Sequence, residues 1–184
     1  MNDHAFWPGT KMLRSLASPE GTDEARASAN GRTTTTIDLL NRALSIARTG
    51  AMRCEWQYFA ALRNHSPALA AAALEHANEA LDHAERISER IVKLGQKPDA
   101  VPASTARGRE ANQRDGNSLV TMIGQHLAAD RATINSYREI AALFKTLDPT
   151  SQQLIDDIVS AEEACAGHLA DVLDEASTQK RGGI

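Results

Sequence analysis

Apolar side chains recur at alternating steps of three and four along four separate segments of the chain. In the first segment they fall at Ile37, Leu40, Leu44, Ala47, Ala51, Cys54, Tyr58 and Ala61. This spacing places them on one side of an α-helix, which we expect to run from Thr36 to about Asn64. Thr35 or Thr36 is predicted to cap its start, because a threonine hydroxyl accepts a hydrogen bond from a free backbone N–H of the first turn.

Three further segments show the same spacing, and residues that end helices separate them. The second helix is expected over residues 67–94, since Ser66 and Pro67 are typical of a helix start and Gly95 of a helix end. The third is expected over residues 117–146 and the fourth over 151–177, with a break at Asp148-Pro149 between them.

Residues 96–115, between the second and third helices, predict a long loop because they carry prolines, glycines and charges without apolar spacing. An extended segment of this length reaches from one end of a long helix to the other, so the helices that it joins can run parallel. Two short turns and one long crossover predict an all-α fold, an antiparallel four-helix bundle.

The two ends of the chain are expected to lie outside the bundle, which spans residues 36–177. Residues 1–35 show no periodicity and predict a flexible N-terminal tail, and residues 178–184 a short C-terminal tail. The only apolar feature of the N-terminal tail is Phe6-Trp7-Pro8. This feature belongs either to an unstructured leader or to a short anchor that docks on a neighbouring subunit or another partner.

Composition narrows the classes of function. The chain has 184 residues, of which 42% are hydrophobic and only 4% aromatic, which favours helices over a β-sandwich. The net charge of −4 gives no general attraction to nucleic acid or to an anionic membrane, and the charges of the N-terminal tail are balanced. Nucleic acid is therefore disfavoured as a partner.

The cysteines and the apolar runs indicate in which cellular compartment the protein is expected. The segment after Met1 has no apolar stretch typical of a secretory leader, and the longest apolar run, residues 68–74, is too short to cross a membrane. We therefore expect a cytoplasmic protein with no membrane partner, in which Cys54 and Cys165 are reduced thiols.

Polar side chains interrupt the predicted interior of three helices. They are His76, His83, His126, Asp130, Glu162 and Cys165. A buried carboxylate is costly unless it is paired, hydrogen-bonded or bound to a metal ion. Each of these residues alone fits a satisfied polar group of the core, but six of them on three helices favour a metal site or its remnant.

Several short motifs lie in the order and at the spacing of a known family. They are residues 39–44 (LLNRAL), 74–79 (LEHANE), 83–87 (HAERI), 130–139 (DRATINSYRE) and 148–150 (DPT), followed by Glu162-Glu163. Over about residues 37–176 the chain resembles the bacterioferritin and Dps-like branch of the ferritin-like proteins. The resemblance implies iron storage, self-association through dimers into a hollow shell, and a di-iron centre. That centre takes one glutamate from each of the first and third helices and a Glu-x-x-His pair from each of the others.

This sequence departs from that ligand pattern. The glutamate of the first helix is replaced by Ala47 and that of the second helix by Ala80, while the third helix offers Asp130. On the fourth helix Glu162 is kept, but Cys165 replaces the histidine. The resemblance therefore implies a degraded ferroxidase centre, and no haem is expected because Leu81 stands at the position of the haem-binding methionine.

Two metal sites and one metal-free arrangement remain open. The vestigial centre offers ligands for a single zinc or iron ion from His83, Asp130, Glu162 and Cys165. Alternatively, Asp130 and Glu162 hydrogen-bond to His83 without a metal. Glu79, next to Ala80, is expected to face solvent or a subunit contact because it is rotated about 100° around the helix.

A displaced site is the other metal-binding alternative. His76, His126 and His168 are predicted to lie at one height on three helices, with Cys54 close by on the first. Such a set of imidazoles would suit a single zinc or iron ion.

The leading hypothesis is therefore a weak or non-catalytic shell subunit for iron storage, acting alone or with an intact ferritin-like paralogue. The alternatives are a bundle that binds a single metal ion and an interaction protein. In the latter, the bundle is a scaffold and the N-terminal tail is the docking segment.

Overall fold

The structure is a computed structural model that describes residues 19–100 and 119–182. These residues form four helices and no strand. The helices are α1 (Pro19–Arg63), α2 (Pro67–Lys93), α4 (Leu119–Phe144) and α5 (Pro149–Gly182). The prediction of an all-α four-helix fold is confirmed.

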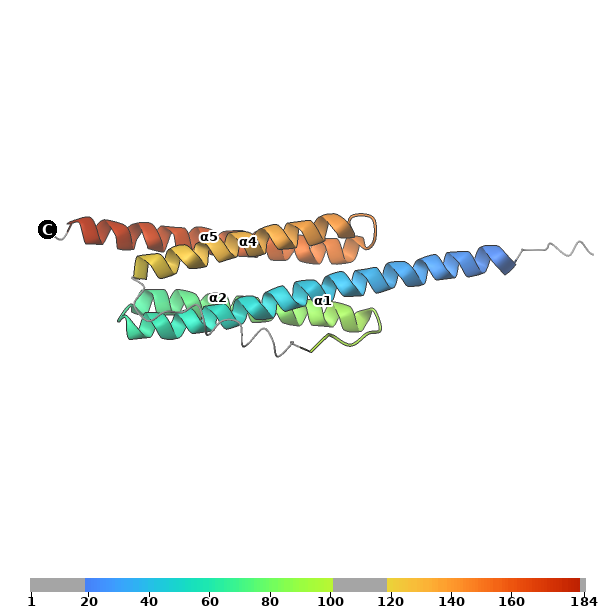
Figure 1. The fold of residues 1–184 in the computed structure, drawn as a ribbon, viewed down its shortest axis with the longest axis horizontal. Coiled ribbons are helices and arrows are strands. Elements are labelled where there is room, and N and C mark those ends of the chain that lie inside the picture. Colours follow the sequence, from blue (N-terminus) through green and yellow to red (C-terminus); the bar gives the residue numbers. More distant parts are fainter. Residues whose placement is uncertain (1–18, 101–118, 183–184) are drawn as a thin grey trace, which may run out of the picture.

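The helices form two antiparallel pairs that lie side by side, α1 with α2 and α4 with α5 (Figure 1). Helices α2 and α4 run in the same direction, as a long crossover between them requires (Figure 1). The first residues of this connection turn back along α1, where Asp99 N–H donates to Asn41 Oδ1 at 3.0 Å and Arg48 Nη1 donates to the Asp99 carbonyl at 2.6 Å. Most of the predicted loop, residues 101–115, and the first residues of the predicted third helix, 117–118, lie outside the described part of the chain.

The ends of α2 are set by local backbone chemistry. Gly95 has a φ of +82°, its N–H donates to the Val92 carbonyl, and the N–H of Gln96 donates to the Ile91 carbonyl. This pair of bonds is the Schellman arrangement that glycine favours, so the predicted end at Gly95 is confirmed. At the start of α2, Ser66 makes no side-chain capping bond. Ser66 therefore occupies the N-cap position, as expected, without the side-chain bond of a serine cap, and Pro67 opens the helix.

Helix α1 begins at Pro19 and not at Thr36. The predicted threonine cap is therefore wrong, and Thr35 lies inside the helix, where its hydroxyl donates to the Gly31 carbonyl. The side chains of residues 26–35 are all exposed in this chain. An apolar spacing marks a helix only where one face is buried, so this exposed extension carried no such signal.

The tails are correspondingly shorter than expected. Helix α5 continues to Gly182, so most of the predicted C-terminal tail is helical. The start of the predicted N-terminal tail, including Phe6-Trp7-Pro8, lies outside the described residues.

The interior consists of two apolar clusters with a polar zone between them. The larger cluster includes Leu40, Leu44, Ile87, Ile91, Tyr137, Ile140, Phe144, Ile155 and Ile158. The smaller one is formed by Ala61, Leu69, Ala70, Ile123 and Leu169. His76, His83, His126 and Asp130 are buried between these clusters, at intermediate positions on α2 and α4. None of the described helices is long and apolar enough to cross a membrane.

Candidate functional site

A cavity in this polar zone is lined by all four helices. Its lining residues are Ile46, Ala47, Gly50, Arg53 and Cys54 of α1, His76, Glu79 and Ala80 of α2, Asp130 and Thr133 of α4, and Glu162 and Cys165 of α5. Ala47 and Ala80, where the family resemblance expects carboxylates, therefore present methyl groups to this cavity. Three of the four predicted residues of the vestigial centre line it as well.

The four predicted residues of the vestigial centre are divided among three separate pairs. His83 Nδ1 lies 3.2 Å from Glu162 Oε1. Asp130 Oδ1 accepts a hydrogen bond of 3.0 Å from Arg53 Nη2. The thiol of Cys165 donates to Glu79 Oε2. Each of these four predicted side chains thus already has a partner within the protein.

Asp130 is the most constrained of these groups, because it is only 5% exposed. Burial raises the pKa of its carboxyl, and Glu162 raises it further, whereas the guanidinium of Arg53 and the nearby His76 oppose the shift. A guanidinium remains charged at any relevant pH, so Arg53 is a permanent cation at this carboxylate.

Arg53 and Glu79 were not among the predicted site residues. Glu79 was expected to face solvent or a subunit contact, but its side chain is half-buried and bonds Cys165. A long side chain can reach around the helix to a partner that the angle of its Cα position would not indicate. The signal for Arg53 was present in the sequence as a charged residue next to Cys54, which belongs to the predicted apolar face of the first helix.

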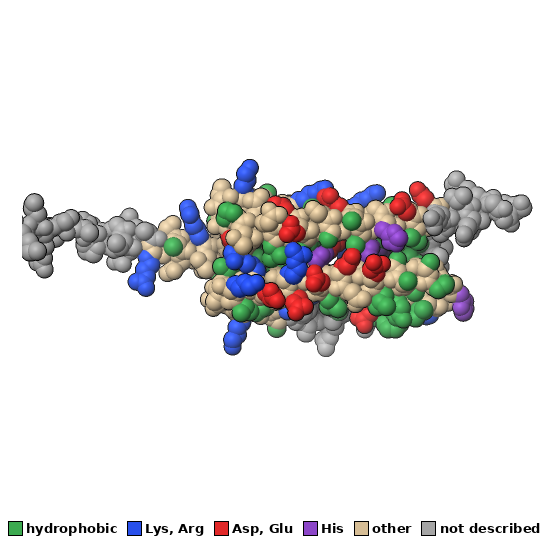
Figure 2. All heavy atoms as spheres, turned by 180° about the vertical axis from the view of Figure 1, so that it is seen from behind, with side chains coloured by type: hydrophobic (Ala, Val, Ile, Leu, Met, Phe, Trp, Pro, Cys, Tyr) green, Lys and Arg blue, Asp and Glu red, His purple; other side chains and the backbone are tan. Residues whose placement is uncertain are grey.

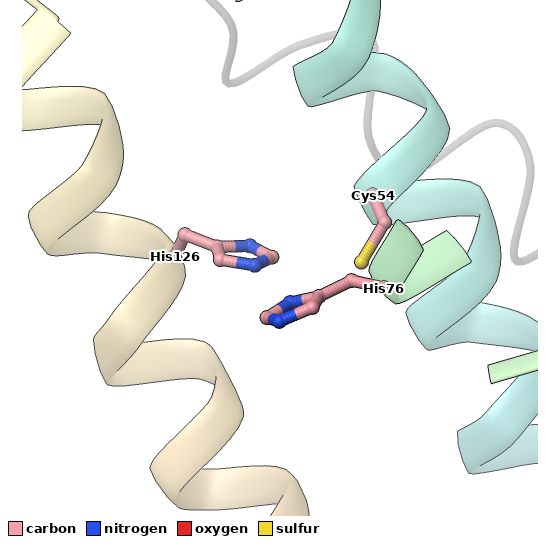
Figure 3. Close-up of side chains that lie close together, drawn as sticks. All are labelled: Cys54, His76 and His126. Atoms are coloured by element: carbon pink, nitrogen blue, oxygen red, sulfur yellow. The ribbon is translucent and has the colours of Figure 1, made fainter. Parts of the chain in front are cut away.

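Two of the three histidines predicted for a displaced site lie together. The rings of His76 and His126 are stacked, with centroids 5.9 Å apart and an angle of 28° between their planes. His168 is exposed on α5 and does not join them. The third potential ligand is instead the thiol of Cys54, which points from α1 toward the two rings (Figure 3). One ligand atom from each of Cys54, His76 and His126 lies within 4.8 Å of the others.

Two groups of this cluster, His126 and Cys54, are uncharged near neutral pH. Burial, with Arg53 and His76 as lesser causes, lowers the pKa of His126 to about 3. Burial raises the pKa of Cys54 to about 12. The pKa of Cys165 is also raised, first by burial and then by the hydrogen bond to Glu79. Neither thiol is therefore activated as a nucleophile.

Comparison with known proteins places this bundle in a family. A ferritin-like domain matches residues 37–178, which is most of the chain. The chain belongs to the ferritin-like domain family. This ferritin-like chain is also similar in fold to solved structures, although a search of curated protein sequences returns no match.

Three of these structures illustrate the likeness. A dodecameric thioferritin, the bacterioferritin-related protein of Bacteroides fragilis, is 23% identical with a TM-score of 0.71, over 88% of this chain and 99% of that one. The bacterioferritin of Desulfovibrio desulfuricans, which has a diiron site, is 20% identical with a TM-score of 0.71, over 82% and 84%. A mutant of Dps1 of Mycobacterium smegmatis is 16% identical with a TM-score of 0.68, over 78% and 97%.

Proposed function

We propose that this chain is a ferritin-like shell subunit that handles stored iron but lacks an efficient di-iron oxidation centre of its own. The observation that carries the proposal is which side chains line the mid-bundle cavity. Methyl groups of Ala47 and Ala80 face it, and the guanidinium of Arg53 holds Asp130. These residues do not fit a di-iron centre.

The charges around the cavity support the same conclusion. A pair of ferrous ions brings a large positive charge that several carboxylates must neutralise. Asp130 is engaged by Arg53, Glu162 by His83 and Glu79 by Cys165. Binding two ions would disrupt all three pairs and would bring them close to the fixed charge of Arg53, which is unfavourable in a partly buried cavity.

Self-association is supported by apolar side chains that the single chain leaves exposed. Trp56, Phe59 and Leu62 follow one another at steps of three on α1, and each is about half exposed. Apolar atoms also gather over the α1–α2 pair near the turn that joins these helices (Figure 2). Exposed apolar patches of this kind mark protein interfaces, and the similar thioferritin is dodecameric.

Oxidation of Fe(II) in air by the metal-free protein tests the proposal. We expect an absorbance trace that matches buffer alone, whereas an intact ferritin gives a saturable burst. The Ala47→Glu/Ala80→Glu double variant adds two carboxylates to the cavity and should gain a burst whose amplitude rises with subunit concentration. Wild-type protein with a saturable burst of its own would contradict the proposal.

A mixed shell gives the subunit a role despite the missing centre. In such a shell an intact ferritin-like paralogue would oxidise the iron, and this chain would contribute wall and interior surface. Co-expression of the two chains, followed by native mass spectrometry of the purified shell, would show whether both enter one assembly.

A further inference from the structure

Cys54, His76 and His126 bring three potential metal ligands together from three helices, α1, α2 and α4. One ligand atom from each lies within 4.8 Å of the others, and the sulfur and the two rings face one another (Figure 3). Ligand atoms around a tetrahedral zinc ion lie about 3.5 Å apart, given metal–ligand bonds of about 2.0–2.3 Å. Small rotations of these three side chains would therefore close the set around one ion.

His126 has a ring nitrogen without a partner. The residue is only 3% exposed, and its Nδ1 makes no hydrogen bond to any described residue. Its Nε2 lies 3.2 Å from Asp130 Oδ2, a buried oxygen that also makes no hydrogen bond to any described residue. In the tautomer with the proton on Nε2, the lone pair is on the buried Nδ1. A histidine that ligates a metal ion commonly has a carboxylate beside its other nitrogen.

The charges around Cys54 also favour a cation. Arg53 is the one cationic group that acts on the thiol, whereas Asp130, Glu162 and Glu79 all act with the opposite sign. The neutral imidazole of His126 can ligate without first losing a proton to solvent. A divalent ion would add positive charge where the acidic groups outnumber the basic one.

We infer that Cys54, His76 and His126 bind a single divalent transition-metal ion, with zinc as the best match for one thiolate and two imidazoles. His76 and His126 also line a neighbouring cavity with Gln57 and mostly apolar side chains, and a water molecule there would supply the fourth ligand. Binding forms a metal–sulfur bond while the Cys54 thiol releases its proton to solvent, so no electron is transferred. This inference does not depend on the proposed role in iron handling.

A second set of potential ligands shares His76 with the first. It consists of His76, Glu79 and Cys165. Its ligand atoms also lie within 4.8 Å of one another. In that set, however, the Cys165 thiol already donates to the Glu79 carboxylate, so two of the three groups satisfy each other. Among the residues that the structure describes, the thiol of Cys54 has no such acidic partner, and its sulfur is the better donor for the ion.

Cobalt is a suitable probe, because Co²⁺ replaces Zn²⁺ in tetrahedral sites and its bond to a thiolate absorbs light. We expect the metal-free full chain to bind one Co²⁺ with a thiolate-to-cobalt band that Zn²⁺ abolishes. Cys54→Ser and His126→Gln should each weaken Co²⁺ binding by more than about 100-fold, beyond the loss typical of an outer-shell partner. The matched control, Cys165→Ser, should leave the band and the affinity unchanged.

The pair of serine variants makes the outcome decisive. A band that survives Cys54→Ser and disappears in Cys165→Ser would place the ion on the second set and overturn the inference, as would the absence of any thiolate band in wild-type protein. Circular dichroism confirms that each variant folds.

X-ray absorption of the cobalt-loaded wild-type chain is a second test that needs no variant. One sulfur and two imidazoles are expected, whereas one sulfur and one imidazole would contradict the site.

Discussion

The two oxygens of Asp130 face groups on different helices, and only Oδ1 makes a hydrogen bond within the described residues. Oδ1 is bonded to Arg53 of α1, and Oδ2 lies near Nε2 of His126, one turn earlier on α4. Because arginine cannot give up its charge at any ordinary pH, an ion can approach Asp130 only by displacing the guanidinium. Arg53 thus lies beside both the expected di-iron ligands and the cluster of Cys54, His76 and His126, since Arg53, Cys54, His76 and Asp130 line the same cavity.

The buried neutral histidine predicts a loss of stability in acid. The pKa of His126 is about 3 in the folded chain against 6.5 in the unfolded chain, so only the unfolded state takes up this proton between those values. The free energy of unfolding should therefore fall as the pH falls from about 6.5 toward 3, by up to about 1.4 kcal/mol per pH unit. At the acid end of this range Asp130 partly offsets the fall in the free energy of unfolding, since its pKa is raised in the folded chain.

Urea unfolding of metal-free wild type and His126→Gln at pH 7, 6 and 5 measures this contribution. Glutamine cannot take up a proton, so the variant should lose less stability between pH 7 and pH 5 than wild type. Asp130, Arg53 and His76 are present in both proteins and serve as a common background. Identical losses in the two proteins would show that His126 is not held neutral by burial.

At the scale of the element, the start of α5 is tied to the end of α2 by a compact polar network. Asp148 Oδ1 accepts from the Thr150 N–H at 3.2 Å and so caps α5, while its Oδ2 lies 2.7 Å from Arg90 Nη2. Arg90 Nε also donates to the hydroxyl of the fully buried Ser151, at 3.0 Å. One carboxylate therefore serves as a helix cap, an ion-pair partner and a hydrogen-bond acceptor.

Asp148→Ala should lower the free energy of unfolding by about 1–3 kcal/mol, because it removes a helix cap and leaves Arg90 without its carboxylate. The hydrogen bonds of Ser151 and Arg90 hold the pKa of Asp148 below 3.8 despite the opposing effect of burial. Its contribution is therefore present above that pH and is lost as the pH falls through the lower, folded pKa.

The matched control is Glu89→Ala, which removes an exposed ion pair with Lys93 one turn away. Denaturant unfolding at pH 7 should show a loss below about 0.5 kcal/mol for this variant. Equal losses for Asp148→Ala and Glu89→Ala would mean that the network at the start of α5 adds nothing beyond a surface pair.

At the scale of the whole molecule, the exposed apolar side chains of α1 predict assembly. A double change of Trp56→Glu and Phe59→Glu places charges in the middle of the expected interface, so the assembled species should give way to smaller ones. Light scattering coupled to size exclusion measures the mass. Leu143→Glu, on α4, changes an equally exposed leucine as the control. If both variants retain the wild-type mass, the α1 face is not the interface.

The positions of the helices and several buried polar residues could be predicted from the sequence. Spacing along the chain and breakers such as Gly95 and Pro149 determined the four helices, because a buried helical face repeats every three to four residues. The same spacing identified His76, His83, His126 and Asp130 as buried polar residues, and all four are buried in the structure. The exposed start of α1 escaped this reasoning because a helix without a buried face has no such repeat.

The partners of the buried polar groups were decided by the tertiary structure alone. Periodicity assigns a residue to a face of its helix, but it does not say which neighbour a side chain will meet or how far that side chain will reach. Three contacts depend on the rotation and height of the packed helices. They are Arg53 with Asp130, Glu79 with Cys165, and Cys54 with the two stacked rings. For the same reason periodicity did not reveal that His168 is exposed on α5.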